Sequence, residues 1–172
     1  VRDSIIEPTL QAMIDKGNPF VGFLYIGLMM VEDEPFVIEY NVRMGDPETQ
    51  VVIPLLKTSL YSIIDGIMNN DIVDCKNKEG YAVTVVLSSD GYPGSYEKGK
   101  IIYGLEDSKD ELIFHAGTVE KNGQILTSGG RVLNVIGFGK SLKEAIDNAY
   151  ELVSNIEFEN KYFRKDIGKK GL

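Results

Sequence analysis

The stretch Glu39-Tyr40-Asn41-Val42-Arg43-Met44-Gly45-Asp46-Pro47-Glu48-Thr49-Gln50 decides how this sequence folds and what it can bind. Residues 36–42 favour a β-strand, in which side chains two positions apart point to the same side. Glu39, Asn41 and Arg43 therefore project together. A carboxylate and an amide oxygen are hard ligands of the kind that Mg²⁺ prefers, with phosphate oxygens and water completing its shell. A polar edge strand that faces solvent has the same alternation, and this alternative stays open.

The residues after this strand predict a tight turn and the start of a helix. Gly45 allows the turn, and Asp46-Pro47 fits a helix N-cap followed by proline at the first helical position. Glu48 adds favourable charge, and the helix is expected to end at Leu55 or Leu56. Its free backbone N–H groups can bind an anion, whereas the two acids suit an ammonium group or a metal. A well-capped helix without a further role is the alternative.

Upstream, apolar periodicity predicts a helix and a β-hairpin. Apolar residues at spacings of three and four place a helix over residues 5–14, with Pro8 in its first turn. The apolar run Phe20–Val31 is too short to span a bilayer and is interpreted as a buried strand. A turn at Glu32–Pro35 connects it to the strand over residues 36–42, so the two strands form a hairpin.

Downstream, a change in composition marks a domain boundary. Ser59 is expected to cap a second helix that runs through Ile67, and the chain turns polar over residues 69–80. We therefore place one domain at residues 1–70 and a second, β-rich domain at residues 71–172, which makes the fold class α+β. The elements expected in the second domain are strands over 81–87, 100–103, 112–119, 124–127 and 131–136, a hairpin turn at Asn122-Gly123, and a final helix opened by a capping box of Ser141 and Glu144.

The charge balance restricts the classes of partner. The 172 residues contain 18 Lys and Arg against 26 Asp and Glu, which gives a net charge of −8. Nonspecific nucleic-acid binding depends on excess cations that displace counterions, so no nucleic-acid partner is expected. No apolar run reaches the ~20 residues needed to cross a bilayer, so no membrane partner is expected. The single cysteine, Cys75, fits a reducing cytosol, and we predict a cytoplasmic protein.

Several motifs together resemble one enzyme family. The segment 39–50 is similar to the signature of phosphoribosylamine–glycine ligases, which are ATP-grasp enzymes of de novo purine biosynthesis. The other matching motifs, in the order of that family, are Gly22–Met29, Gly91-Tyr92-Pro93-Gly94, Phe114–Thr118, Gly129–Leu133 and Arg164–Gly168. The resemblance implies that residues 1–70 are the last part of an ATP-grasp domain and that residues 71–172 are the family's small β-rich C-terminal domain.

The resemblance also implies a reaction and the residues that carry it. ATP, glycine and 5-phosphoribosylamine would give glycinamide ribonucleotide, ADP and phosphate through a glycyl phosphate. Glu39 and Asn41 would bind the Mg²⁺ (or Mn²⁺) that bridges the ATP phosphates. Arg43 would be the catalytic residue that stabilises the transferred phosphoryl group, a role suited to its bidentate fork. Asp46 and Glu48 would orient the ammonium group of glycine.

Other polar residues are candidates with simpler alternatives. Gly130 and Arg131 are expected to bind the phosphate or ribose of the substrate, because glycine lets a ligand approach the backbone. A hairpin turn with a solvated arginine is the alternative. His115 is expected to be a packed or hydrogen-bonded core residue, Tyr92 to pack within its turn, and the basic cluster Lys161–Lys170 to be a solvated tail.

Parts of the ATP-grasp pattern are absent from the sequence. The preceding strand segment, Tyr25–Met29, lacks the second acidic metal ligand of that pattern, and Glu32 and Glu34 lie in the turn. The glycine-rich phosphate loop, the lysines that contact ATP and the adenine-binding strand are missing as well. We therefore expect a fragment that is inactive alone and needs an N-terminal part. The alternatives are another ATP-grasp carboxylate–amine ligase and a noncatalytic binding or assembly module of the same fold.

Overall fold

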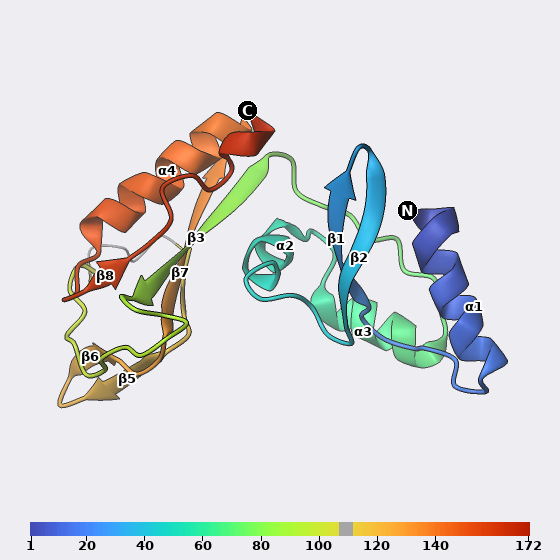
Figure 1. The fold of residues 1–172 in the computed structure, drawn as a ribbon, viewed down its shortest axis with the longest axis horizontal. Helices are drawn as coiled ribbons and strands as arrows, with labels where there is room; N and C mark the ends of the chain where they lie inside the picture. Colours follow the sequence, from blue (N-terminus) through green and yellow to red (C-terminus); the bar gives the residue numbers. More distant parts are fainter. Residues whose placement is uncertain (107–111) are drawn as a thin grey trace. The chain divides into compact units, whose positions relative to one another are not determined.

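The computed structural model describes residues 1–106 and 112–172, which form two compact units. The first unit contains Val1–Asp46 and Thr58–Cys75, and the second contains Pro47–Lys57 and Lys76–Leu172. Helices and antiparallel strands both occur, so the predicted α+β class is confirmed (Figure 1). The domain boundary between residues 70 and 71 stays a prediction. Among the described helices, none has the length and apolar character needed to cross a membrane.

Helical segments of the first unit lie close to their predicted positions. A π-helical turn, Arg2–Ile6, leads into α1 (Glu7–Asp15), and Pro8 lies in the first turn of α1. α3 (Leu60–Asn69) begins where the sequence predicts, with Ser59 in the N-cap position, but the Ser59 side chain makes no capping hydrogen bond. The helix ends at Asn70, whose left-handed backbone (φ 58°) is a common way to terminate a helix.

The predicted hairpin of the first unit is confirmed. It consists of β1 (Tyr25–Val31) and β2 (Glu34–Asn41), which pair antiparallel. Glu32 and Asp33 form its turn with φ values of 50° and 65°. Two consecutive left-handed residues match the right-handed twist of the flanking strands, so they close a hairpin tightly.

The prediction that Phe20–Val31 is one buried strand is wrong. The strand begins only at Tyr25, after Gly22 takes a φ of 136° that interrupts the extended run. Met29 and Met30 are 53% and 56% exposed. The physical reason is that a two-stranded hairpin leaves both faces to other elements, so an apolar run is buried only where another layer packs on it.

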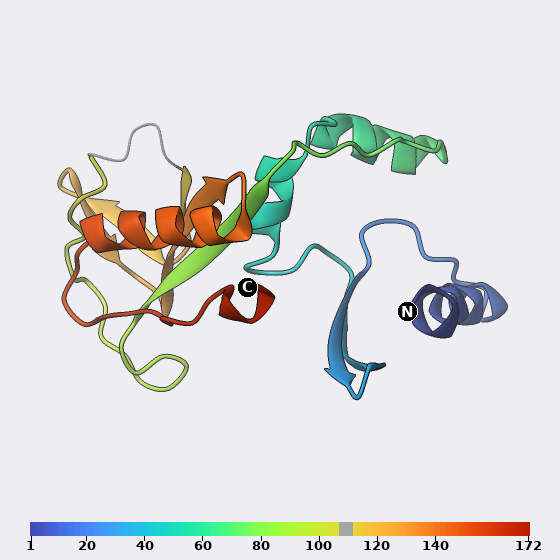
Figure 2. The same ribbon diagram turned by 90° about the horizontal axis from the view of Figure 1, so that it is seen from above.

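A four-stranded antiparallel sheet forms the centre of the second unit. Its strand order is β4 (Leu112–His115), β7 (Arg131–Gly139), β3 (Tyr81–Ser89) and β8 (Lys161–Tyr162). α4 (Leu142–Asn155) lies along β3 and β7 and covers one face of the sheet (Figure 2). The core residues between sheet and helix are Val83, Val85, Leu87, Leu133, Val135, Ala145, Ile146, Ala149, Leu152 and Val153.

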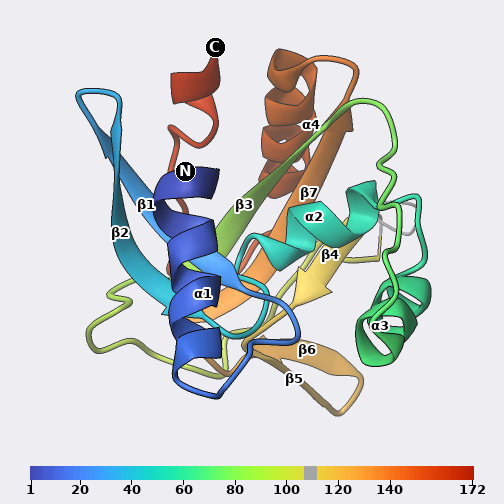
Figure 3. The same cartoon turned by 90° about the vertical axis from the view of Figure 1, so that its right-hand side faces the viewer.

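The remaining elements of the second unit are short. α2 (Thr49–Leu55) packs against β3 and β7. β5 (Thr118–Lys121) and β6 (Gln124–Thr127) form a separate hairpin that follows β4 (Figure 3). Its turn is the predicted Asn122-Gly123, with φ values of 54° and 73°. A 3₁₀ turn at Lys169–Gly171 precedes the last residue.

Two strands predicted in this unit differ from the structure. The run over residues 112–119 breaks at Gly117, where a side chain would approach the carbonyl oxygen of Arg131 and the backbone of Gly129 to within 3 Å. Residues 100–103 form only isolated bridges, because Ile101 pairs with Leu126 of β6 and Tyr103 pairs with Glu157, outside any strand. Local sequence propensity reveals neither the close approach at Gly117 nor the separate pairings of Ile101 and Tyr103.

The start of α4 carries the predicted capping box in a shifted form. Ser141 Oγ accepts a hydrogen bond from the N–H of Glu144 at 3.2 Å. The Glu144 carboxylate in turn accepts from the N–H of Lys140 at 2.7 Å, one residue before the cap. The Ser141 bond satisfies one N–H group that the helix itself leaves without a partner, and the Glu144 bond joins the residue before the cap to the first turn.

The end of α4 is held by a lysine that the sequence places in a solvated tail. Lys161 Nζ donates to the carbonyl oxygens of Val153 (3.2 Å) and Ile156 (2.5 Å) and to the Glu157 carboxylate (2.9 Å). Its side chain is only 10% exposed. The solvated-tail interpretation is therefore wrong for Lys161, because this cation satisfies carbonyl groups at the negative end of the helix.

Candidate functional site

The two predicted metal ligands lie side by side on β2. Asn41 Nδ2 donates to Glu39 Oε1 at 2.9 Å, so the two side chains occupy the same side of the strand, as alternation predicts. Gly27 faces Glu39 across the hairpin. A Cβ at Gly27 would lie 3.0 Å from Glu39 Cγ, so glycine leaves room for the Glu39 side chain. The arrangement presents a carboxylate and an amide at one point of the hairpin.

The other acid of β2, Glu34, lies far from this pair along the strand. Among the described residues, no group of three or more His, Cys, Asp or Glu side chains could hold a metal ion. Glu34 pairs with Val31 near the turn, whereas Glu39 pairs with Gly27. Five residues of strand separate the two glutamates, which corresponds to about 17 Å. A metal bound at Glu39 and Asn41 can take further ligands from phosphate oxygens and water.

The segment after β2 differs from the prediction. Arg43 Nη1 donates to the carbonyl oxygen of Met44 at 3.0 Å. Residues 46–48 form a turn, and α2 starts only at Thr49, with Glu48 in the N-cap position and no side-chain capping bond. Asp46 as N-cap is therefore wrong. The chain passes from the first unit to the second after Asp46, and the packing of α2 on the sheet sets where the helix begins.

The late start of α2 removes one candidate anion site. α2 has seven residues and contains Pro54. So short a helix has only a small macrodipole, and its start lies two residues later than predicted. Asp46 and Glu48 remain candidates as acids, but without a helix N-terminus between them.

Gly130 and Arg131 lie at the start of β7, beside a cavity of about 390 Å³ in the second unit. A Cβ at Gly130 would overlap the Tyr92 ring, so only glycine lets this ring pack against the backbone. Arg131 Cζ lies 5.9 Å from the centroid of the same ring, in cation–π contact. Tyr92 thus packs in its turn as predicted and also forms a wall of the cavity.

A second arginine lines this cavity. Arg164 belongs to the basic segment that the sequence predicts to be a solvated tail, and it also lies in one of the matching motifs. Its guanidinium donates to Asp166 through Nε (2.9 Å) and Nη2 (2.7 Å). This bidentate pair raises the pKa of Arg164 and lowers the pKa of Asp166, chiefly through the side-chain hydrogen bonds. The available signal was compositional, since the chain has only four arginines.

The cavity combines cations with aromatic and apolar walls. Apart from the two arginines, its lining includes Tyr92, Pro93, Val86, Tyr162 and Phe163. An acidic chain with a net charge of −8 repels anions overall, so placed arginines are needed to hold one. The chemistry fits a small anion with an apolar or ring-shaped body.

The predicted site residues fall into two groups. Glu39, Asn41, Arg43 and Asp46 belong to the first unit, and Glu48, Gly130 and Arg131 belong to the second. The structure brings Glu39 and Asn41 into contact and places Arg131 at a cavity, with Gly130 against the Tyr92 ring of its wall. His115 lies apart from both groups: it is exposed and hydrogen-bonds through Nδ1 to Thr118 Oγ1 at 2.9 Å. The prediction of a core histidine is therefore wrong, although the ring is hydrogen-bonded.

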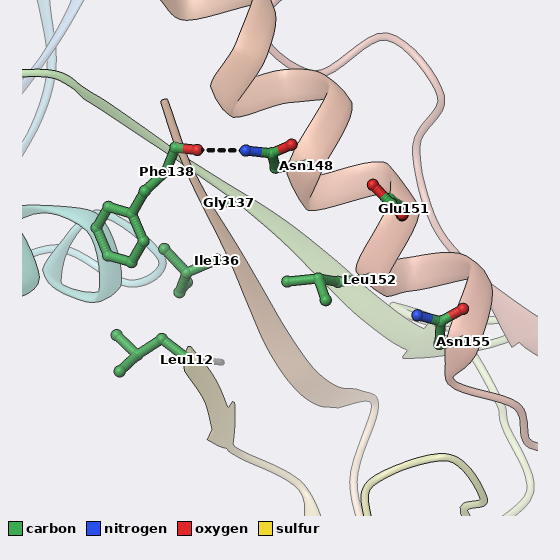
Figure 4. Close-up of a pocket in the computed structure, with 8 residues that line it drawn as sticks. All are labelled: Leu112, Ile136, Gly137, Phe138, Asn148, Glu151, Leu152 and Asn155. Atoms are coloured by element: carbon green, nitrogen blue, oxygen red, sulfur yellow. Dashed lines mark hydrogen bonds between the residues drawn. The ribbon is translucent and has the colours of Figure 1, made fainter. Parts of the chain in front are cut away.

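Another cavity of the second unit contains none of these residues. It has a volume of about 370 Å³ and lies between α4 and the strands β4 and β7 (Figure 4). Asn148 at its edge donates to the carbonyl oxygen of Phe138 at 2.7 Å. Its polar side chains are two asparagines and Glu151, without a cation among its described lining residues. This composition offers no attraction for an anionic substrate.

Comparison with known families finds two matching segments in the chain. Residues 1–49 match the model described as phosphoribosylglycinamide synthetase, ATP-grasp (A) domain, so the Glu39–Asn41 hairpin is of the ATP-grasp class. Residues 82–170 match the model described as phosphoribosylglycinamide synthetase, C domain. The chain belongs to the phosphoribosylglycinamide synthetase family, which confirms the resemblance of the motifs.

Relatives match over nearly the whole chain. A phosphoribosylamine–glycine ligase of Chlorobaculum tepidum is 46% identical and matches 100% of this chain and 42% of its own length. The trifunctional purine biosynthetic protein adenosine-3 of Gallus gallus is 42% identical, with 100% of this chain and 18% of that protein matched. The crystal structure of phosphoribosylamine–glycine ligase from Thermotoga maritima superposes with a TM-score of 0.85 at 39% identity, covering 95% of this chain and 41% of that one. This chain thus spans about two fifths of the length of the single-enzyme relatives.

Proposed function

We propose that this chain is the carboxy-terminal part of a phosphoribosylamine–glycine ligase that works in cytosolic de novo purine (IMP) biosynthesis. Family membership and the names of the full-coverage relatives support this assignment. The matched relatives are more than twice as long as the matched region, so the chain acts with a further N-terminal part and is inactive alone. The substrates are ATP, glycine and 5-phosphoribosylamine.

The reaction has two transfer steps. A glycine carboxylate oxygen attacks the γ-phosphorus of ATP, ADP leaves, and a glycyl phosphate forms. The amine nitrogen of phosphoribosylamine then attacks the acyl carbon, loses a proton, and expels phosphate to give glycinamide ribonucleotide. Such transfers depend on positioning the reactants and on neutralising the phosphate charge. The residues of this chain are suited to those two tasks.

The Glu39–Asn41 pair is the observation that carries the proposal. Its donor set, one carboxylate and one amide within hydrogen-bond distance of each other, fits Mg²⁺ or Mn²⁺ that also binds ATP phosphates. A bound metal ion supplies charge neutralisation on the phosphates. Within the pair, the 2.9 Å hydrogen bond from Asn41 orients the Glu39 carboxylate.

The neighbouring residues complete the assignment for the first transfer. Arg43 follows the pair two positions on, and its planar fork can bind two oxygens of a phosphoryl group. Asp46 is exposed, and Glu48 is partly exposed. Their carboxylates would attract the ammonium group of glycine.

The cavity of about 390 Å³ that Arg131 and Arg164 line (the Arg131 cavity) would hold the phosphate and ribose of phosphoribosylamine. Two arginines line it, and its aromatic and apolar walls suit a sugar ring. Gly130 keeps the Tyr92 ring in place under the Arg131 guanidinium. The net negative charge of the chain makes this local cation pair important for an anionic substrate.

The test compares two glutamates of the same strand in a complete ligase, made by joining this chain to the remainder of the Chlorobaculum tepidum relative. Glu39→Gln should lower ATP-dependent turnover on the order of 100-fold, because one metal oxygen is lost. Glu34→Gln, also exposed and on β2, is the matched control and should keep parental turnover. Both variants should unfold at the parental urea concentration. Parental turnover of Glu39→Gln would remove Glu39 from the metal role.

A further inference from the structure

Two separate segments of the chain, β3 and the segment that follows β8, contribute residues to the wall of the Arg131 cavity. Residues of β3 alternate between the two faces of the sheet: Val83, Val85 and Leu87 pack in the core beneath α4, whereas Thr84, Val86 and Ser88 line the cavity. The cavity therefore lies on the face of the sheet opposite α4. The segment after β8 passes the edge of the sheet and contributes its second arginine, Arg164.

One hydroxyl group holds the main chain of this segment. The Tyr150 hydroxyl donates to the carbonyl oxygen of Arg164 at 2.7 Å and accepts from the N–H of Ile167 at 3.1 Å. A single oxygen thus bridges two main-chain groups three residues apart. The bridge fixes the backbone from which the Arg164 side chain extends.

The backbone of Tyr150 belongs to a well-packed part of α4. The preceding residue, Ala149, is fully buried, and Val153, one turn further on, is 1% exposed. The Tyr150 ring packs at 6.2 Å from the Phe163 ring, next to Arg164 in the sequence. Position 168 has a left-handed φ of 76°, where glycine suits the turn and lies against the Ile146 side chain. α4 therefore offers a fixed frame for the segment.

The side chain of Arg164 is oriented as well. Asp166 holds it through the two bonds described above, both within the stretch that Tyr150 bridges. The hydroxyl of Tyr150 thus fixes the backbone and the carboxylate of Asp166 fixes the guanidinium. Arg131 is fixed from the other direction by β7 and the Tyr92 ring.

We propose that Tyr150 is a positioning residue for the substrate phosphate: its hydroxyl sets Arg164 at the wall of the cavity that Arg131 also lines. This inference rests on the proposed function of the cavity. Tyr150 does not line the cavity, so it acts only through the segment that it holds. Its role is to order the segment that carries Arg164 before an anion binds, so that less conformational entropy is lost on binding.

The test uses Tyr150→Phe, which keeps the ring and removes only the hydroxyl. In the complete ligase, the KM for phosphoribosylamine should rise about 10-fold, the effect of losing roughly one hydrogen bond's worth of binding free energy. The KM values for ATP and glycine and the kcat should stay within twofold. Tyr103→Phe is the matched control, since Tyr103 is 59% exposed in the same unit and does not line the cavity. It should change none of these constants.

A binding measurement separates this inference from the proposed function. The Kd for ribose 5-phosphate, measured by calorimetry on the same ligase, should rise with Tyr150→Phe and with Arg131→Met. If Arg131→Met binds like the parent, the cavity is not the phosphate site and the proposed function of the cavity fails. If Arg131→Met weakens binding and Tyr150→Phe does not, only the positioning role is overturned. An equal loss in all KM values with a lower unfolding midpoint would also overturn it, because that pattern marks a purely structural role.

Discussion

Replacing Lys161 by methionine should destabilise the second unit without touching the candidate site residues. The methionine keeps most of the aliphatic length and removes the ammonium group. In the parent, that group donates to two carbonyl oxygens at the end of α4, at 3.2 Å and 2.5 Å. The lysine side chain is 10% exposed, so water can replace these bonds only in part.

The magnitude follows from these contacts. A hydrogen bond that involves a charged group contributes about 1.5–3 kcal/mol, and two of them, less the cost of desolvating the ammonium, leave about 2–3 kcal/mol. The pair with Glu157 adds little, roughly 0.5 kcal/mol, because that carboxylate is exposed. We therefore expect Lys161→Met to lower the free energy of unfolding by about 2–3 kcal/mol.

The assay is urea unfolding of the chain, followed by circular dichroism. Lys143→Met is the matched control, since Lys143 forms an exposed ion pair with Asp147 and its side chain is 70% exposed. That variant should lose less than about 0.5 kcal/mol. A loss below about 1 kcal/mol for Lys161→Met, or one equal to the control, would refute the capping role of Lys161.

Three other outcomes follow from the same structure. Gly130→Ala should destabilise the chain by about 1–3 kcal/mol and weaken ribose 5-phosphate binding, since its Cβ would displace the Tyr92 ring; urea unfolding and calorimetry measure these effects. The pKa of Asp166 should lie below its ordinary 3.8 and return toward it in Arg164→Met, as NMR titration would record. Because this carboxyl pKa is lowered in the folded state, its contribution to stability should be present above pH 3.8 and be lost as the pH falls through the lowered value. The 172-residue chain alone should release no ADP from ATP when glycine and phosphoribosylamine are supplied, whereas turnover at normal enzyme rates would show that it is sufficient.

Features that depend on neighbouring residues could be predicted from the sequence. Alternation placed Glu39 and Asn41 on one side of a strand, and the structure brings them to 2.9 Å. Asn122-Gly123 indicated a hairpin, because both positions accept left-handed backbone. Ser141 indicated the start of α4 for a similarly local reason.

Features that depend on distant residues could not be predicted in this way. Asp46 fits an N-cap locally, but the helix begins at Thr49, where the second unit packs it against the sheet. The Tyr150 hydroxyl reaches residues 14 and 17 positions away, across the edge of the sheet. Lys161 is basic and near the end of the chain, yet the fold places it beneath the last turn of α4. Only the tertiary arrangement assigns these roles.

The most direct test of the proposed function is product formation by the complete ligase built on this chain. With ATP, glycine and phosphoribosylamine present, ADP release should match the amount of glycinamide ribonucleotide identified by mass spectrometry, and omission of any one substrate should stop both. A strong preference for another amine, with little glycinamide ribonucleotide formed, would contradict the assignment and indicate a different ATP-grasp carboxylate–amine ligase.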